Sequence, residues 1–140
     1  MTSNKKVFLD INIILDFLEQ SRQRHEKTVE LIEYLTVNNY EICISEDMLT
    51  TIYYISKQKT TVLKFLKTIM GQWKIFSFGE QVLNYAISAA LKNDQDLEDL
   101  LQCFCARENG CSAIITHDKS FYDCDISIYT ANEFLRRMRI

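Results

Sequence analysis

The chain alternates short, continuous runs of apolar residues with longer segments in which apolar residues recur every three or four positions. Brief apolar runs are typical of buried strands, and the longer periodic segments are typical of helices. Strands are expected at residues 6–10, 41–45, 73–77, 112–116 and 126–130. Such alternation predicts an α/β fold in which a mostly parallel central sheet is flanked by helices on both faces.

Helices are expected at residues 11–20, 23–37, 47–57, 62–69, 80–91, 97–110 and 131–138. Asn12, Ser45 and either Thr60 or Thr61 are candidate N-caps, because their side-chain oxygens can accept backbone N–H groups of a first turn. Gly110 is expected to end the helix that begins at residue 97, because glycine readily adopts the left-handed conformation that follows many helices.

Length and composition narrow the class of protein. The 140 residues are expected to form a single domain over residues 1–140. There is no proline and there are three widely spaced glycines, so the chain contains neither the Walker phosphate-binding loop nor the glycine fingerprint of dinucleotide enzymes. No apolar stretch is as long as a membrane span, and no signal peptide is recognisable at the N-terminus. We therefore expect a cytoplasmic protein without a membrane partner.

The five cysteines are an odd number, and most of them lie within apolar runs. Both features favour reduced thiols over a disulfide framework. Cys103 and Cys105 stand two positions apart on an expected helix, so their side chains point to different faces and do not form half of a zinc site. We expect buried free thiols.

Charged residues are unevenly distributed, although the net charge is only −3. Residues 48–79 contain five lysines and no acid, whereas residues 80–108 contain six acids against one lysine and one arginine. A solvated helix face is the simplest explanation of the lysines, and the alternative is a surface that contacts a polyanion. The candidate contacts to an RNA backbone are Lys57, Lys59, Lys64 and Lys67.

Acidic residues stand where several of the expected elements begin or end. Asp10 ends the first strand, Asp118 follows the strand at 112–116, and Asp96 and Asp99 lie at a helix start. In a parallel sheet such positions converge at the carboxyl edge, where ligands bind. Clustered carboxylates resist ionising together unless a cation neutralises them, and oxygen ligands suit Mg²⁺ or Mn²⁺. The pattern predicts a divalent-metal site of the kind that hydrolyses phosphodiesters.

Three segments together resemble the PIN domain, the ribonuclease fold found in VapC-type toxins of toxin–antitoxin pairs. They are FLDINIILDFL (8–18), DLEDLLQCFCARENG (96–110) and AIITHDKSF (113–121), in the family's order and at suitable spacing. The resemblance covers essentially the whole chain. It implies a PIN-like fold, an RNA substrate, Mg²⁺ or Mn²⁺ as cofactor, a small antitoxin protein as partner, and dimerisation.

The resemblance also implies roles for individual residues. The metal-binding, catalytic carboxylates would be Asp10, Asp96, Asp99 and Asp118. Asn12 would be the hydrogen-bonding companion of the first acid, and Thr116 would orient the last. Two positions depart from the family pattern: Thr51 stands where most PIN nucleases carry a second acid, and Ser120 stands where many relatives carry an acid. The remaining carboxylates suffice for one metal, and a second metal is in question.

Each candidate also has a simpler structural explanation. Asp96 followed by Asp99 is a good N-cap arrangement, and Asp10 can simply end a strand. Asp118 and the residues after it have a composition that is common in turns. The conjunction of these acids in an α/β pattern favours a metal site, and most of the weight comes from the resemblance to the PIN domain.

Four aromatic residues, Tyr53, Tyr54, Phe65 and Trp73, are expected in the core rather than stacked on RNA bases. His117 is expected to be a solvent-exposed turn residue. Asp16, on the same helix face as Asn12, either supports the site or forms only local hydrogen bonds.

These observations predict a metal-dependent endoribonuclease of PIN type, in which a metal-activated water attacks an RNA phosphodiester in line. One alternative is a PIN-like fold that has lost catalysis and binds RNA or protein, for which Thr51 is the supporting feature. A second alternative is a haloacid-dehalogenase-type phosphatase with Asp10 as its nucleophile, although that chemistry needs an aspartate where Asn12 stands.

Overall fold

The computed structural model describes residues 5–118 and 125–139. Within these residues the strands are β1 (Lys6–Leu9), β2 (Glu41–Ser45), β3 (Lys74–Phe76), β4 (Ala113–Ile115) and β5 (Ser127–Tyr129). The helices are α1 (Ile11–Leu18), α2 (His25–Val37), α3 (Asp47–Ile55), α4 (Lys59–Ile69), α5 (Gly79–Asn93), α6 (Leu97–Glu108) and α7 (Ala131–Met138). In this part of the chain no helix is both long and apolar enough to cross a membrane.

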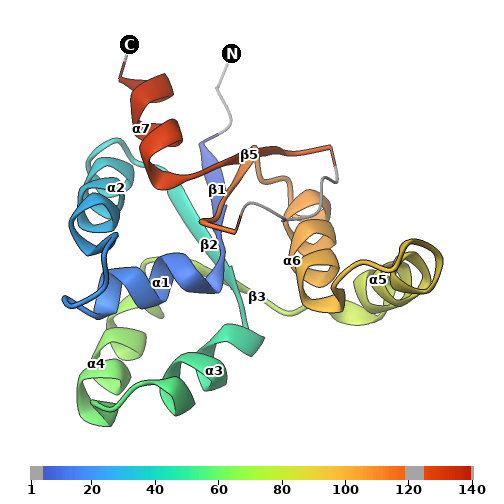
Figure 1. Cartoon of the computed structure of the whole chain (residues 1–140), viewed down its shortest axis with the longest axis horizontal. Coiled ribbons are helices and arrows are strands. Elements are labelled where there is room, and N and C mark those ends of the chain that lie inside the picture. Colours follow the sequence, from blue (N-terminus) through green and yellow to red (C-terminus); the bar gives the residue numbers. More distant parts are fainter. Residues whose placement is uncertain (1–4, 119–124, 140) are drawn as a thin grey trace.

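The strands form one parallel sheet in the order β3-β2-β1-β4-β5. Helices α1, α2 and α7 lie on one side of the sheet, and α5 and α6 lie on the other (Figure 1). Both faces of β1 are therefore covered, and Val7, Phe8 and Leu9 are completely buried. Burial on both faces explains why the strands are continuous apolar runs rather than alternating ones. The expected α/β architecture is confirmed.

The strand order creates a switch point between β1 and β4, because β2 and β3 are added on one side of β1 and β4 and β5 on the other. Ligands bind to such sheets beyond the carboxyl ends of the strands at this point. Sheet hydrogen bonding continues one residue past the strands: Asp10 N donates to Ile115 O (3.0 Å), and Thr116 N donates to Tyr129 O (2.9 Å). The backbone thus fixes Asp10 and Thr116 at the carboxyl edge.

Helix α1 begins at Ile11, as expected, but its N-cap is Asp10, the acid at the end of β1. Asp10 has extended backbone, and its Oδ1 accepts the N–H of Ile11. Asn12 lies inside the first turn of α1, so the expectation that it caps this helix is wrong. Gly110 has φ +75° directly after the C-cap of α6, as expected for a helix stop.

The N-caps expected at Ser45 and at Thr60 or Thr61 are also wrong. Helix α3 begins after Glu46 and helix α4 after Gln58, and neither cap residue makes a side-chain hydrogen bond to the helix. Ser45 is held in extended conformation by the pairing of β2 with β3, which places it in the strand rather than at the helix start.

The four cysteines within the described residues are buried, but they are not all free. Cys43, Cys105 and Cys111 are free and buried, as expected, and burial raises the pKa of Cys105 to about 12. Cys103 is disulfide-bonded, so the expectation of reduced thiols is wrong for this residue. Cys124 lies outside the described residues.

The aromatic residues around α3 and α4 divide between core and surface. Phe65 packs against Trp73 with ring centroids 5.7 Å apart and against Phe17 at 5.8 Å. Tyr53 is half-buried, but Tyr54 is 77% exposed, so the expectation that it lies in the core is wrong. Among the residues of α3, only Met48 and Ile52 are buried, and Tyr54 stands two positions from Ile52, on another face of the helix.

Candidate functional site

Asp10 is a buried carboxylate held in one orientation by its neighbours. It is 5% exposed; its Oδ1 accepts the N–H of Ile11 and its Oδ2 accepts the hydroxyl of Thr116, each at 2.7 Å. Burial raises its pKa, and the charge of Asp118 raises it further, whereas the hydrogen bonds from Thr116, Ile11 and Asn12 lower it. The result is a fixed carboxylate at the switch point whose charge needs compensation.

Thr116 joins two of the predicted site residues. Its hydroxyl donates to Asp10 Oδ2, and its Oγ1 accepts the backbone N–H of Asp118 at 3.0 Å. Thr116 is 2% exposed, so this arrangement is well shielded from water. Thr116 thus contacts both Asp10 and the backbone of Asp118. The orienting role expected for Thr116 stays a prediction.

The start of α6 brings two more predicted carboxylates to the same edge. Asp96 is the N-cap of the helix, and its Oδ2 accepts the N–H of Asp99 at 3.1 Å. The pKa of Asp99 is raised to about 7, first by burial and then by the charges of Asp96, Asp118, Asp10 and Glu98. Asp99 therefore lies within electrostatic range of the other three predicted carboxylates.

Glu98 also faces this cluster, although the sequence pattern assigned it no role. Burial raises its pKa, and the charges of Asp47, Asp10 and Asp96 raise it further. Its spacing could have indicated such a role, because Gln102 stands four positions later and therefore on the same helix face. A glutamine within the apolar run that follows Leu100 is otherwise unexpected.

The carboxylates form an open cluster rather than a finished cage. Within residues 5–118 and 125–139, no group of three or more His, Cys, Asp or Glu side chains could hold a metal ion as it stands. The donor chemistry nonetheless fits a hard divalent cation, because the converging groups are carboxylates that raise one another's pKa. Mg²⁺ is commonly held by one or two protein carboxylates while it keeps water and phosphate oxygens as its other ligands.

A second polar network lies beside the carboxylates and is centred on Asp16. Its Oδ1 accepts Arg22 Nε at 2.7 Å, and its Oδ2 lies 2.7 Å from His117 Nδ1. His25 Nδ1 lies 2.9 Å from the backbone oxygen of Asp16. The side chain of His117 is only 5% exposed, so the expectation of a solvent-exposed turn residue is wrong. The fold buries it against α1.

This network clamps the segment after β4 onto α1. Besides the contact with Asp16, the backbone N–H of His117 donates to Asn12 Oδ1 at 3.4 Å. Burial lowers the pKa of His117, and the hydrogen bond to Asp16 acts in the opposite direction. Because a carboxylate only accepts hydrogen bonds, His117 Nδ1 is the donor to Asp16. Asp16 and Asn12 thus position the residue that precedes Asp118.

The residue at the family's usual second-acid position, Thr51, offers no carboxylate. It lies on α3, where its hydroxyl donates to Asp47 O at 3.3 Å. The second departure that the sequence raised, Ser120, lies outside the described residues.

One of the four candidate lysines has a structural role. The ammonium of Lys59 donates to the backbone oxygens of Tyr53, Tyr54 (3.2 Å) and Ser56 (2.8 Å). A cation there satisfies carbonyls that the end of α3 leaves without helical partners. The other three, Lys57, Lys64 and Lys67, are exposed.

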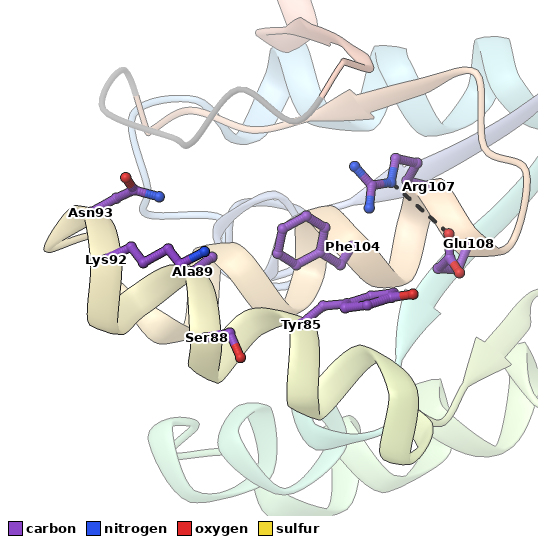
Figure 2. A pocket seen from close by; sticks show the side chains of 8 residues that line it. All are labelled: Tyr85, Ser88, Ala89, Lys92, Asn93, Phe104, Arg107 and Glu108. Atoms are coloured by element: carbon purple, nitrogen blue, oxygen red, sulfur yellow. Dashed lines mark ion pairs between the residues drawn. The ribbon is translucent and has the colours of Figure 1, made fainter.

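A hollow lies between α5 and α6 (Figure 2). Arg107 lies over the ring of Phe104 at 4.7 Å, and Tyr85 meets the same ring edge-on with centroids 6.4 Å apart. The hollow is lined by Tyr85, Ser88, Ala89, Lys92, Asn93, Phe104, Arg107 and Glu108. None of the predicted site residues belongs to this set.

Several solved structures share the fold. VapC20 of Mycobacterium tuberculosis, described as a sarcin–ricin loop cleaving toxin, matches with a TM-score of 0.65 and 12% identity, over 82% of this chain and 92% of its own. VapBC2 of Rickettsia felis, bound to a DNA fragment from its promoter, matches with a TM-score of 0.61 and 20% identity, over 89% and 96%. A toxin–antitoxin complex from Klebsiella pneumoniae matches with a TM-score of 0.67 and 12% identity, over 89% and 97%.

Sequence similarity extends over nearly the whole chain. A PIN-domain family model matches residues 6–120. Ribonuclease VapC1 of Aquifex aeolicus (strain VF5) is 36% identical over 139 residues, which cover 96% of each protein. Members of that ribonuclease family are typically metal-dependent. The chain therefore belongs to the PIN-domain family, as a homologue of the VapC-type toxin ribonucleases.

Proposed function

We propose that residues 1–140 form one PIN-like domain that hydrolyses RNA phosphodiesters as a metal-dependent endoribonuclease. The observation that carries the proposal is the position of Asp99, whose pKa is raised to about 7 by burial and by Asp96, Asp118, Asp10 and Glu98. Like charges held together in this way destabilise a protein, and they are a recurrent property of functional sites. A divalent cation is the partner that neutralises them.

In this proposal the cation, Mg²⁺ or Mn²⁺, is held by Asp10, Asp96, Asp99 and Asp118. When bound, it polarises the phosphodiester and lowers the pKa of a water molecule. Thr116 fixes the orientation of Asp10 through its hydroxyl, and Asn12 holds the backbone just before Asp118. Because its pKa is about 7, Asp99 is partly protonated at neutral pH in the free protein, so binding of the cation releases this proton.

Cleavage of labelled single-stranded RNA tests the proposal. The protein is expected to cut in Mn²⁺ or Mg²⁺ and to stop in EDTA. Asp10→Asn is expected to abolish cutting while preserving the fold, because asparagine also caps helices well. Glu80→Gln, an exposed acid on α5, is the matched control and is expected to cut normally. Cutting that persists in EDTA or in Asp10→Asn would overturn the proposal.

A binding module without catalysis is the second candidate function, and the observation that favours it is Thr51. With a hydroxyl in place of an acid, α3 contributes one negative charge fewer to the site. Folded, metal-loaded protein that binds RNA and cuts none of a varied panel would support this candidate. The phosphatase alternative is dropped, because the chain is a PIN-domain protein.

In the proposed biological setting, the protein is a toxin that a small antitoxin protein inhibits by binding to it. We also propose that two copies of the chain form a homodimer. Support comes from the toxin–antitoxin complexes among the structures that share the fold. An RNA substrate places the protein in the cytoplasm in this proposal.

The exposed lysines of α4 are expected to contact the RNA backbone. Lys64→Ala combined with Lys67→Ala should weaken RNA binding and reduce the slope of log affinity against log salt by about 1.4, since each phosphate contact to a single strand contributes about 0.7. Anisotropy titrations at several KCl concentrations, in the Asp10→Asn background, measure this slope. Lys27→Ala combined with Lys92→Ala removes the same charge from α2 and α5 and is the control; equal slopes in both double variants would refute the assignment.

A further inference from the structure

An exposed aromatic ring stands near the end of α3. Tyr54 is 77% exposed, and within the described residues the other exposed aromatic side chain is Tyr85, at 43%. The ring of Tyr85 already packs edge-on against Phe104 beside the hollow of α5 and α6. A single exposed aromatic residue is ordinary on a protein surface, so the case for a function of Tyr54 depends on what surrounds it.

The ring of Tyr54 is exposed, but two neighbours hold its orientation. Tyr53 meets it edge-on, with ring centroids 5.6 Å apart and planes at 76°. The ammonium of Lys59 lies 4.8 Å from the centroid of Tyr53 and 5.9 Å from that of Tyr54. Lys59 is itself fixed, because its ammonium donates to the backbone oxygens of Tyr54 and Ser56. A ring that is already oriented loses little conformational entropy when a flat ligand binds to it.

The surface around this ring is positively charged. Residues 48–79, which cover α4 and all of α3 except its first residue, contain five lysines and no acid. Three of these lysines are fully exposed: Lys57, Lys64 and Lys67. Such a segment attracts a polyanion, and an exposed ring within it adds a contact for a flat aromatic group. Single-stranded RNA carries both phosphates and bases, whereas an acidic peptide supplies only the charge, so the combination favours RNA.

The position of α3 connects this ring with the carboxyl edge of the sheet. Helix α3 leads away from the end of β2, so its first residue, Asp47, lies at that edge (Figure 1). Tyr54 stands seven residues further along α3, a distance of about 10 Å along the helix axis. Binding sites for single strands commonly span several nucleotides. A strand bound at the carboxyl edge can therefore extend along α3 as far as Tyr54.

We propose that Tyr54 is a base-stacking subsite for the RNA strand, at a nucleotide away from the bond that is cut. The ring stacks on one base, Tyr53 and Lys59 hold the ring in place, and the exposed lysines contact the neighbouring phosphates. Every base has an aromatic face, so this contact adds affinity without selecting a sequence. The inference rests on the proposed function, because it takes the same RNA strand as the ligand.

Binding of labelled single-stranded RNA is compared with binding of an abasic strand of the same length, which has the same phosphates and no bases. Anisotropy titrations use the Asp10→Asn protein, so that the strand stays intact. Adding Tyr54→Ala is expected to weaken binding of the RNA about tenfold, as loss of one stacked base does, and to leave binding of the abasic strand unchanged. The slope of log affinity against log salt is expected to stay the same, because no phosphate contact is removed.

Two further variants serve as controls. Tyr54→Phe keeps the ring and is expected to bind both strands as before, and Tyr85→Ala makes the same truncation on α5 and is also expected to change neither affinity. The fold is expected to tolerate Tyr54→Ala, because the side chain is exposed and alanine is a strong helix former.

The outcomes separate this inference from the proposed function. If Tyr54→Ala leaves RNA binding unchanged, or weakens binding of both strands equally, the stacking subsite is refuted and the exposed ring is left to a protein partner. RNA cleavage by the wild type in Mn²⁺ is measured separately, so the proposed function stands in that case if cutting is observed. If the protein neither binds nor cuts RNA, the inference and the proposed function are both refuted.

Discussion

Replacing Asp99 with asparagine is expected to make the metal-free protein more stable and its RNA cleavage about a thousandfold slower. The loss of rate follows from the proposed function, in which Asp99 holds the cation. Such a carboxylate supports several kcal/mol of transition-state stabilisation, and about 1.4 kcal/mol corresponds to a factor of ten. The gain in stability follows because asparagine carries no charge to be repelled by Asp96, Asp118, Asp10 and Glu98.

The stability difference between Asp99→Asn and the wild type depends on pH with a definite sign. The pKa of Asp99 is raised from 3.8 to about 7, so the folded protein binds this proton more tightly than the unfolded chain does. The stability that this group contributes is therefore present at low pH and is lost as the pH rises through the window between these values. The variant has no such loss. At pH values above 7, the melting temperature of the variant is expected to exceed that of the wild type by about 2–4 °C. This corresponds to a difference of roughly 1 kcal/mol in the free energy of unfolding.

Melting curves at several pH values, recorded in EDTA and in Mn²⁺, provide the measurement. Mn²⁺ is expected to raise the melting temperature of the wild type and to leave Asp99→Asn nearly unchanged. Asp94→Asn removes an exposed carboxylate close by in the chain, from a left-handed position that asparagine also tolerates, and serves as the control. A variant less stable than the wild type above pH 7 would show that Asp99 is not repelled in the fold.

Truncating Asp16 to alanine is expected to reduce the free energy of unfolding by about 3 kcal/mol. Removing one partner of a buried, hydrogen-bonded charge pair typically costs about 3–5 kcal/mol, and the partial exposure of Arg22 places this case at the lower end. Without Asp16, the Nδ1–H of the His117 ring loses its partner while the ring stays buried. The segment that carries Asp118 then loses its clamp, so RNA cleavage is expected to fall through kcat rather than KM.

Urea unfolding compares this variant with Glu19→Ala. Glu19 also pairs with Arg22, at 3.4 Å, but its side chain is 34% exposed. An exposed pair of this kind contributes less than about 1 kcal/mol. Equal destabilisation by the two variants would mean that Asp16 is no more than another surface partner of Arg22.

The strands, the parallel sheet and the convergence of the acids could be predicted from the sequence by itself. Strands buried on both faces must be apolar throughout, so runs such as EICIS are recognisable without neighbours. Parallel strands bring their carboxyl ends to one edge, so an acid after a strand, such as Asp10, has a predictable location. The architecture and the general position of the site could therefore be predicted from local periodicity and from the parallel direction of the strands.

Only the tertiary structure decided which neighbour each polar side chain meets. Asp10 caps α1 in place of Asn12, and His117 is buried against Asp16. The ammonium of Lys59 donates to a backbone oxygen at the end of α3. His117 and Asp16 are 101 positions apart, and no local pattern encodes such a contact. Glu98 lies one helical turn before Gln102, but its pKa is also raised by the charges of Asp47 and Asp10, which other elements supply. A side chain's charge state and hydrogen bonds are set by what surrounds it in space, and packing of distant segments determines those surroundings.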